Sequence, residues 1–336
     1  KRQPLYYGWI GKNFYFASEL KAIEAVIPRS KLEIDDQGLA CFFRYGYINA
    51  PCSIYKGLNK LMPASFLTIT RDNVQRPHNH SPYPGEKKFS PATYWCLLDV
   101  ANSGLSNQFR HVADATEELE TLLRDTVSMQ RIADVDVGTF LSGGIESSLV
   151  SAITQADSTR NIKTFTIGFE DAEYDESGYA EKVARHLGTD HKTVRLSGKD
   201  ALKIVPKLCE IYDEPFADSS QIPTCLVSEI ARRDVVVCLS GDGGDELFSG
   251  YNRYIWSDSI WGKVRGIPLP VRKYIAYMLQ LPKPEIWDRI YQLYSSGSSA
   301  DTMKSQHMVG LKIQKLSRFL ASEDLNEAYQ YLLSYW

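Results

Sequence analysis

The residues most able to do chemistry lie in two short stretches, each directly after an apolar run. The first covers residues 135–149, V-D-V-G-T-F-L-S-G-G-I-E-S-S-L. The second covers residues 235–251, V-V-V-C-L-S-G-D-G-G-D-E-L-F-S-G-Y. In both, Leu-Ser-Gly closes a run of strand formers. Glycine lets a backbone approach an anion closely, and serine hydroxyls can donate hydrogen bonds to it.

The first stretch has the pattern of a strand, a glycine turn and a helix start, which suits a phosphate group. The first turn of a helix carries free N–H groups and the positive end of its dipole. Ser142, Ser147 and Ser148 add hydroxyl donors, and Glu146 beside an anion needs a cation such as Mg²⁺ between them. The stretch lacks the lysine of the common P-loop. The alternative interpretation is a strand-to-helix turn with glycines for tight packing.

The second stretch places three carboxylates, Asp242, Asp245 and Glu246, close together in the chain. Such a cluster is stable only beside a cation, and Mg²⁺ held by nucleotide phosphates would supply one. The calcium-loop pattern of EF-hands is absent, and an exposed acidic turn is the remaining alternative. Because both stretches follow apolar strands, we expect them to face one ligand.

The elements that must position these stretches alternate along the chain. The expected strands are 136–141, 163–169, 191–195 and 235–239, and the expected helices are 146–157, 176–187, 199–212 and 221–233. A capping box at Asp114–Glu117 predicts a further helix before them. This alternation predicts an α/β fold with a parallel sheet and helices on both faces, whose ligands sit at the carboxyl ends of strands.

Three further residues lie where a ligand of this sheet would bind. Ile167 ends a strand at the same edge and could receive a flat adenine ring, or it could belong to the core. Asp218 and Ser219 precede the helix expected at 221–233. They could meet a carboxylate substrate, or they could simply cap the helix.

The remaining segments carry no evident catalytic residues. Residues 1–75 are expected to be α+β, with strands at 5–10, 13–17 and 65–70, a hairpin turn at Gly11, a helix capped by Ser18 and a second helix at 36–45. Residues 76–110 are rich in Pro, Ser and Asn and predict a surface linker, with His78 and His80 in an exposed loop. Residues 251–336 are expected to be helical, with aromatic side chains that belong to the core, the alternative being that they stack on a ligand.

Composition narrows the functional class. The chain has 336 residues, 43% hydrophobic and 24% charged, with a net charge of −3. This balance is that of a globular protein and gives no electrostatic reason to expect nucleic acid or membrane partners. Six cysteines form no C-x-x-C pair, so we expect buried reduced thiols in a cytoplasmic protein.

These motifs resemble those of glutamine-hydrolysing asparagine synthetases. The resemblance rests on F-L-S-G-G-I-E-S-S-L, T-F-T-I-G-F-E, D-E-P-F-A-D-S-S-Q-I-P-T and C-L-S-G-D-G-G-D-E-L-F-S-G-Y-N-R-Y, in the order and spacing of the family. The first resembles the PP-loop, S-G-G-x-D-S, of ATP pyrophosphatases. Upstream, P-L-Y-Y-G and F-A-S-E-L-K-A-I resemble the last part of the family's N-terminal glutaminase domain.

The resemblance implies a fold and a reaction. The fold would be an α/β PP-loop domain of the adenine nucleotide alpha-hydrolase type at 113–336. It would follow the C-terminal part of an α+β Ntn-type glutaminase domain at 1–75 and a linker at 76–112. The β-carboxylate of aspartate would attack the α-phosphorus of Mg·ATP, and ammonia from glutamine would displace AMP. The protein would be an ATP-dependent carbon–nitrogen ligase acting on small molecules, and a homodimer is compatible with it.

The resemblance also implies roles for residues of this chain. By position, pyrophosphate would be held by Ser142, Gly143, Gly144, Ser147 and Ser148. Adenosine would be bordered by Leu141, Ile167, Ser240 and Gly241. Asp242 and Asp245 would act catalytically on substrate and metal, with Glu146 as a further metal ligand.

Three departures from the family pattern leave alternatives open. Glu146 stands where the family has Asp, and the family's N-terminal M-C-G-I and later K-x-D-R-x-S-M have no match here. We therefore expect an internal fragment of a longer enzyme. The alternatives are the same adenylation chemistry on another carboxylate, as in uronic acid amidation or β-lactam or lasso-peptide ring closure, and a degenerate nucleotide-binding paralogue.

Overall fold

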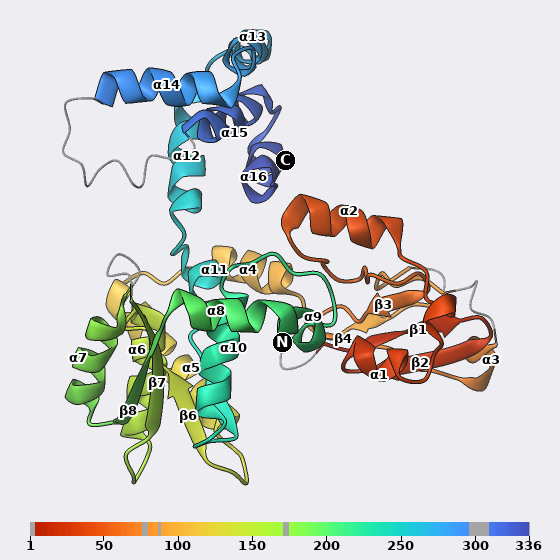
Figure 1. Ribbon diagram of the computed structural model, residues 1–336, viewed down its shortest axis with the longest axis vertical. Coiled ribbons are helices and arrows are strands. Elements are labelled where there is room, and N and C mark those ends of the chain that lie inside the picture. The colour runs from red at the N-terminus through yellow and green to blue at the C-terminus, as the bar shows by residue number, and fades with distance from the viewer. Residues whose placement is uncertain (1–3, 76–79, 87–88, 171–174, 296–308, 336) are drawn as a thin grey trace. The chain divides into compact units, whose positions relative to one another are not determined.

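A computed structural model describes residues 4–75, 80–86, 89–170, 175–295 and 309–335. The chain forms two compact units, residues 1–42 with 46–242 and residues 43–45 with 243–336. The first unit contains an antiparallel sheet and a parallel sheet, and the described elements of the second are helices (Figure 1). The domain boundaries expected near residues 75 and 113 remain predictions.

An antiparallel sheet with the strand order β2–β1–β3 opens the first unit. Its strands are β1 (Tyr6–Ile10), β2 (Asn13–Ala17) and β3 (Leu58–Lys60). Gly11 has a φ of +64° and makes the predicted hairpin turn, so that Ile10 pairs with Asn13. The core beneath this sheet contains Leu20, Ile23, Ile27, Ile48, Ile54 and Leu58.

The helices of this part are α1 (Leu20–Glu24), the 3₁₀ turn η1 (Arg29–Lys31) and α2 (Asp36–Tyr45). Helix α2 confirms the prediction for 36–45, because Asp35 accepts a hydrogen bond from the Gly38 N–H at 2.8 Å and the left-handed Gly46 ends the helix. The Ser18 cap is wrong. The N-cap of α1 is Glu19, without a side-chain bond, and the Leu20 N–H donates to the distant Asp213 carboxylate at 2.7 Å.

The stretch predicted as a linker contains more structure than expected. Strand β4 (Ser65–Phe66) pairs with β5 (Ala92–Thr93) and is shorter than the predicted 65–70, and helices α3 (Arg71–Val74) and α4 (Leu97–Ser106) flank the pair. The exposed-loop prediction for His80 is wrong. Its ring is half-buried against Tyr7 and Trp9, and this burial lowers its pKa. These aromatic partners lie far away in sequence, which local composition could not show. His78 lies outside the described residues.

The parallel sheet has the strand order β8–β7–β6–β9, and every neighbouring pair is parallel, as predicted. Its strands are β6 (Val137–Phe140), β7 (Lys163–Phe169), β8 (Asp190–Leu196) and β9 (Val237–Leu239). The helices around it are α5 (Val112–Gln130), α6 (Ile145–Ala156), α7 (Ser177–Leu187), α8 (Gly198–Ile204), α9 (Leu208–Ile211) and α10 (Gln221–Ala231).

Two helix predictions in this region are wrong in detail. Helix α5 begins at Val112 with His111 as its N-cap, ahead of the capping box expected at Asp114. The single helix expected at 199–212 is divided into α8, the 3₁₀ turn η3 (Val205–Lys207) and α9. Pro206 lies in η3 and lacks the N–H that a continuous helix would need.

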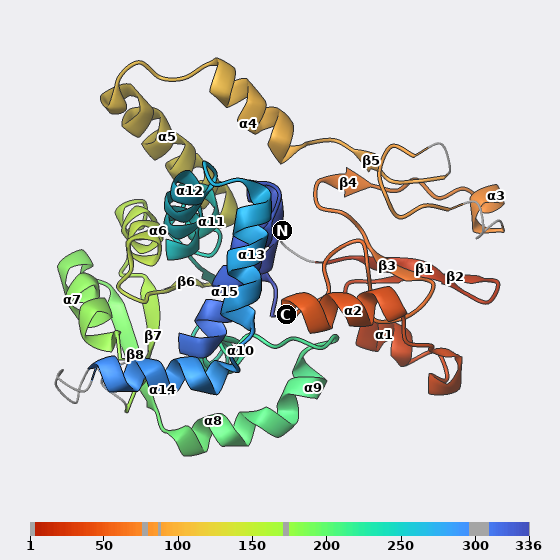
Figure 2. The same cartoon turned by 90° about the horizontal axis from the view of Figure 1, so that it is seen from above.

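Helices cover both faces of the parallel sheet, as predicted (Figures 1 and 2). Alternate residues of a strand point to opposite faces. Val137 packs with α5 and α6 in one cluster, and Leu141 packs with Ala180 and Ala184 of α7 in another. On the opposite face, Phe140 packs with residues of α10. The carboxyl edge of this sheet therefore lies between two layers of helices.

The second unit consists of α11 (Gly244–Phe248), α12 (Asn252–Val264), α13 (Leu269–Gln280), α14 (Pro284–Ser295), α15 (Val309–Ala321) and α16 (Leu325–Leu333). Buried Arg272 of α13 donates to the carbonyls of Leu320 and Ser322 at 3.1 and 2.8 Å, and so caps the end of α15. The helical prediction is confirmed. Many aromatic side chains, including Trp256 and Tyr274, are exposed instead of forming the expected core.

The six cysteines are free thiols, as predicted, but five are half-buried and Cys209 is exposed, so none is fully buried. Among the helices that the structure describes, none combines the length and apolar character needed to cross a bilayer.

Candidate functional site

The two glycine-rich stretches meet at one edge of the parallel sheet. Strand β6 pairs in parallel with β9, with Thr139 opposite Leu239, so the residues after both strands emerge at the same edge. We call residues 142–148 the first loop and residues 240–242 the second loop. A Cβ added to Gly241 would lie 2.8 Å from both the Cβ of Glu146 and the backbone nitrogen of Ser147. The loops are therefore in contact, and they lie at one edge of the sheet as predicted.

The first loop is held against helix α7. Gly143 has a φ of +85°, and a Cβ there would lie 2.8 Å from the Ala180 nitrogen and the Tyr179 Cβ. Ala180 is fully buried and small enough to allow this approach. Sequence reasoning missed this supporting contact. The signal was present as alanines at 180 and 184, one helical turn apart on the face of α7 that packs on Leu141.

Two serines close the first loop on itself. The Ser142 N–H donates to Ser147 Oγ at 3.1 Å, and the two hydroxyl oxygens lie 2.9 Å apart. Ser147 Oγ also lies 3.4 Å from the Gly144 carbonyl. These bonds hold the Ser142 and Ser147 side chains against each other within the loop.

The third serine of the loop is different. Ser148 Oγ is buried and has no hydrogen-bond partner among the described residues. An unpaired buried hydroxyl costs free energy, roughly 1–3 kcal/mol, unless something outside the chain satisfies it. A phosphate oxygen at the helix start would accept this hydrogen bond.

The start of α6 adds the electrostatic part of the site. Its N-cap, Gly144, has no side chain to bond the amides of the first turn. These amides and the helix dipole favour an anion. Glu146 lies in the same turn, half-exposed, and its carboxylate makes no hydrogen bond or ion pair with another described residue. A free carboxylate beside an anion site fits a cation between the two.

Two of the four residues expected to border adenosine, Leu141 and Ile167, differ in access. Only 1% of Leu141 is exposed, and its side chain lies in the core beside α7, so it could meet a nucleotide only through its backbone. Its carbonyl oxygen already accepts a hydrogen bond from the Thr166 hydroxyl. Ile167, one residue further along β7, is half-buried at the sheet edge.

The second loop is open and acidic. Ser240 donates a hydrogen bond to Asp242 Oδ2 at 3.0 Å, and both residues are exposed. Asp245 and Glu246 belong to the second unit. There, Tyr251 donates to Glu246 at 2.9 Å, and this bond raises the pKa of Tyr251 to about 12. Among the described residues, no three acidic, histidine or cysteine side chains form a group that could hold a metal.

The residues expected near the acceptor, Asp218 and Ser219, are both exposed. Asp218 Oδ1 accepts a hydrogen bond from the Ser220 N–H at 2.8 Å, and Ser220 is the N-cap of α10. This bond forms a local turn and uses one carboxylate oxygen of Asp218. The N-cap is Ser220, which makes no side-chain cap, so the alternative that Asp218 and Ser219 cap the helix is wrong.

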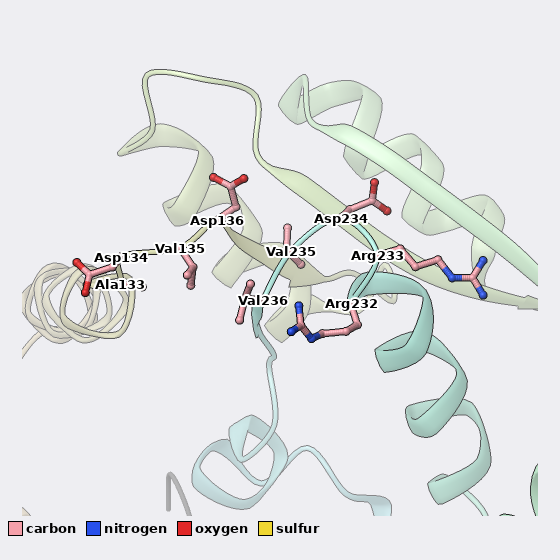
Figure 3. Close-up of a pocket in the computed structure, with 9 residues that line it drawn as sticks. All are labelled: Ala133, Asp134, Val135, Asp136, Arg232, Arg233, Asp234, Val235 and Val236. Carbon is pink, nitrogen blue, oxygen red and sulfur yellow. The ribbon is translucent and has the colours of Figure 1, made fainter.

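A hollow of about 740 Å³ lies at the other edge of the sheet, before β6 and β9 (Figure 3). Its charged residues are Asp134, Asp136, Arg232, Arg233 and Asp234. Their side chains point in different directions in Figure 3, and Asp234 is paired with Lys192 at 2.7 Å. Because ligands of parallel sheets bind at the carboxyl edge, this hollow is not the candidate site.

The motifs at the carboxyl edge agree with comparisons to known proteins. A family profile described as asparagine synthase matches residues 118–332, more than half of the chain. The chain belongs to the asparagine synthase family. A second profile, described as a glutamine amidotransferase domain, matches residues 2–83. The second match agrees with the expected glutaminase-type N-terminal part.

Relatives of this asparagine synthase family chain are found in archaea and bacteria. A putative asparagine synthetase [glutamine-hydrolyzing] 2 of Methanocaldococcus jannaschii is 33% identical over 346 residues, covering 96% of this chain and 62% of the relative. Asparagine synthetase [glutamine-hydrolyzing] 1 of Bacillus subtilis is 32% identical over 256 residues, covering 75% of this chain and 36% of the relative. The chain thus spans less than two thirds of the length of these relatives.

Proposed function

We propose that this chain carries the ATP-dependent acyl-activating site of a glutamine-dependent asparagine synthetase. ATP would be cleaved between its α- and β-phosphates, the β-carboxylate of aspartate would become an acyl adenylate, and ammonia from glutamine would displace AMP to give asparagine. The observation that carries this proposal is Ser148. Its buried, unpaired hydroxyl lies at a helix start, in a loop that contacts the second glycine loop of the family motif.

The first loop would stabilise the departing pyrophosphate. As the bond between the α- and β-phosphates breaks, negative charge grows on pyrophosphate, and fixed donors aimed at that charge are usually the largest single contribution to catalysis. Ser148 and the first-turn amides of α6 would donate hydrogen bonds. Ser142, Gly143, Gly144 and Ser147 would hold the loop in shape.

The second loop and its neighbours would complete the nucleotide site. Ser240 and Gly241 would border adenosine, together with Ile167 and the backbone of Leu141. Asp242 would face the reacting carboxylate, and Asp245 would take part in catalysis and metal binding. Asp218 and Ser219 would lie on the acceptor side.

Magnesium would fit this site through Glu146, whose free carboxylate lies in the first turn of α6. A bound magnesium ion neutralises phosphate charge during the transfer. Glu146 would hold the ion, with Asp245 as a second protein ligand, while Ser148 and the first-turn amides of α6 bind the phosphates. A cytoplasmic location and a homodimer remain predictions.

An ATP–pyrophosphate exchange assay on the full-length protein tests this proposal. Exchange that requires aspartate supports asparagine synthesis. Exchange with a different acid, and not with aspartate, supports the same chemistry on another acceptor. Nucleotide binding without exchange under any acid contradicts the proposal and supports a degenerate paralogue, for which Glu146 in place of Asp is the motivating residue.

A further inference from the structure

The first half of the D-E-P-F-A-D-S-S motif has no place at the nucleotide edge. Glu214 instead reaches the antiparallel sheet of the first unit. Its Oε1 accepts a hydrogen bond from the Ile54 N–H at 2.8 Å, and its Oε2 accepts one from the Tyr6 hydroxyl at 3.2 Å. The same Oε2 forms an ion pair with Lys60 of β3. One carboxylate thus binds three points of the N-terminal sheet region.

The Lys60–Glu214 pair is buried. The side chains are 10% and 9% exposed, and Lys60 also donates to the Ile48 carbonyl at 2.5 Å. Buried charges are tolerated only when they are paired and hydrogen-bonded, and removing one partner leaves the other uncompensated. The burial of Tyr6, together with Glu214 beside it, raises the pKa of the tyrosine hydroxyl. The pair is therefore a constrained contact, unlike the exposed Lys192–Asp234 pair.

Neighbouring residues add to this contact. Asp213 accepts from the Leu20 N–H at 2.7 Å, and its other carboxylate oxygen lies 3.3 Å from Lys21 Nζ. Lys21 also donates to the carbonyls of Glu210 and Ile211, each at 3.2 Å. The Ala217 N–H donates to the Gly46 carbonyl at 2.8 Å. We call residues 210–217 the docking segment, because residues 6–60 bind it along its length.

The docking segment is directly connected to the candidate site. It leads through Asp218 and Ser219 into α10. Helix α10 packs on the sheet and is followed by β9, which ends at the second loop. The docking segment therefore joins the N-terminal sheet region to the part of the chain that carries the candidate site.

We propose that Glu214 and Lys60 are positioning residues that fix the glutaminase-like sheet against the sheet that activates the carboxylate, so that nitrogen from glutamine reaches the acyl adenylate. This inference rests on the proposed function and deepens it. Neither residue touches substrate. Their role is to hold the glutaminase-like sheet and the carboxylate-activating sheet in a fixed relative position. It affects only the reaction that uses nitrogen from glutamine, because that reaction needs both sheets.

The test compares glutamine-dependent with ammonia-dependent asparagine formation in the full-length protein. For Glu214→Gln and Lys60→Met, we expect glutamine-dependent synthesis to fall by about tenfold or more, since small misplacements cost large rate factors. Glutamine should still be hydrolysed in these variants, so that glutamate forms without an equal amount of AMP. Ammonia-dependent synthesis should stay within about twofold of the wild type. The matched control is Asp234→Asn, which weakens surface ion pairs with Lys192 and Lys163 and should change neither activity.

A double variant separates positioning from stability. Lys60→Met with Glu214→Met removes both charges and keeps apolar volume, so it should fold even where a single variant does not. In this double variant we expect glutamine hydrolysis to remain uncoupled from asparagine formation, because the hydrogen bonds to Ile54 and Tyr6 are also lost. Wild-type coupling in this variant would show that the pair serves stability alone and would overturn the inference. Tyr6→Phe, which keeps the ion pair, should lose only about two- to threefold in coupling.

Hydrogen exchange gives a readout that needs no activity. The Ile54 amide should be protected in the wild type and should exchange about tenfold faster in Glu214→Gln. A wild-type Ile54 amide that exchanges freely would overturn the contact itself. If the wild type makes asparagine with neither nitrogen donor, the proposed function fails. If it uses both donors and the variants stay coupled, only the positioning role fails.

Discussion

The first and second loops begin with the same Leu-Ser-Gly after strands of one sheet, yet they are built differently. The first is closed by the Ser142–Ser147 bonds and is held against α7 at Gly143. In the second, the Ser240 hydroxyl donates a hydrogen bond to Asp242, and both residues are exposed. The shared residues determine where the loops lie, and the residues that follow determine how rigid each loop is.

This difference suits two steps of one reaction. Rigid donors act on charge that develops at a fixed place, such as a leaving pyrophosphate. An open acidic loop can adjust to a substrate and a cation. The comparison predicts that substitutions in the first loop lower the rate of the chemical step. Substitutions where the two loops touch should lower the same rate by misplacing the loops.

The largest effect is expected for Ser148→Ala. Removing one preorganised donor should lower ATP–pyrophosphate exchange by about 10²–10³-fold. The melting temperature should stay constant or rise, because an unpaired buried hydroxyl is removed. Ser147→Ala is the matched control, since it breaks the bonds that close the loop and should lower the melting temperature as well. Wild-type exchange by Ser148→Ala would contradict the proposed role of this serine.

Gly241→Ala tests the contact between the loops. The new methyl group would meet Glu146 and Ser147 at 2.8 Å, and backbone cannot move away cheaply. We expect exchange to fall by about 10²-fold, the cost of a shift of ~1 Å in a site of this kind. Gly262→Ala is the control, because no atom lies within 4 Å of the added carbon. Equal activity of both variants would show that the loops need not touch.

Glu146→Asp examines the residue that departs from the family motif. The shorter side chain should place a cation closer to its position in the family, and we expect exchange to rise by about tenfold. The effect should be smaller than for Gly241→Ala, since Glu146 is half-exposed and can adjust. The magnesium dependence of the exchange rate gives the measurement. An unchanged rate at every magnesium concentration would show that the extra methylene does not misplace the ion.

The smallest effect is expected at Cys238, on β9 just before the second loop. Burial raises the pKa of its thiol from 9.0 to about 11. Between these values the unfolded chain loses the proton while the folded chain keeps it, so the free energy of unfolding should fall as pH rises from 9 to 11. Denaturant titrations should show a flatter pH slope for Cys238→Ala. The Cys209→Ala variant, which removes an exposed thiol, should keep the wild-type pH slope. A flatter slope in this variant would show that the effect is not specific to the Cys238 thiol.

The sequence predicted the parallel sheet and its binding edge well. Strand β7 and helix α2 have the predicted bounds, because apolar periodicity and strong caps are local signals. The placement of both loops at one edge followed from the alternation of strands and helices, since parallel strands deliver their carboxyl ends to one edge. The bounds of β7 and α2 depend on residues that are close in sequence.

The parts that could not be predicted depend on distant residues. The Leu20 amide is bonded by Asp213, so Ser18 is not needed as a cap. The His80 ring is half-buried by aromatic residues of β1, although the sequence around it is polar. In helix α4 the apolar side chain of Leu98 is 72% exposed. Local sequence therefore predicts the burial of neither side chain. At the site, the pairing of Ser147 and the isolation of Ser148 were not predictable, because neighbouring serines look alike in sequence.

The contact between Gly143 and Ala180 has a consequence for how the first loop acquires its form. The loop is complete in sequence by Ser148, but the surface that shapes it belongs to α7, a full strand and helix later. During synthesis, every residue of the loop would leave the ribosome before the helix that supports it. A nascent chain that ends after β7 would contain every residue of the first loop, but the loop would lack its native backbone conformation. The ability to bind a phosphate would therefore arise only when α7 packs against the loop.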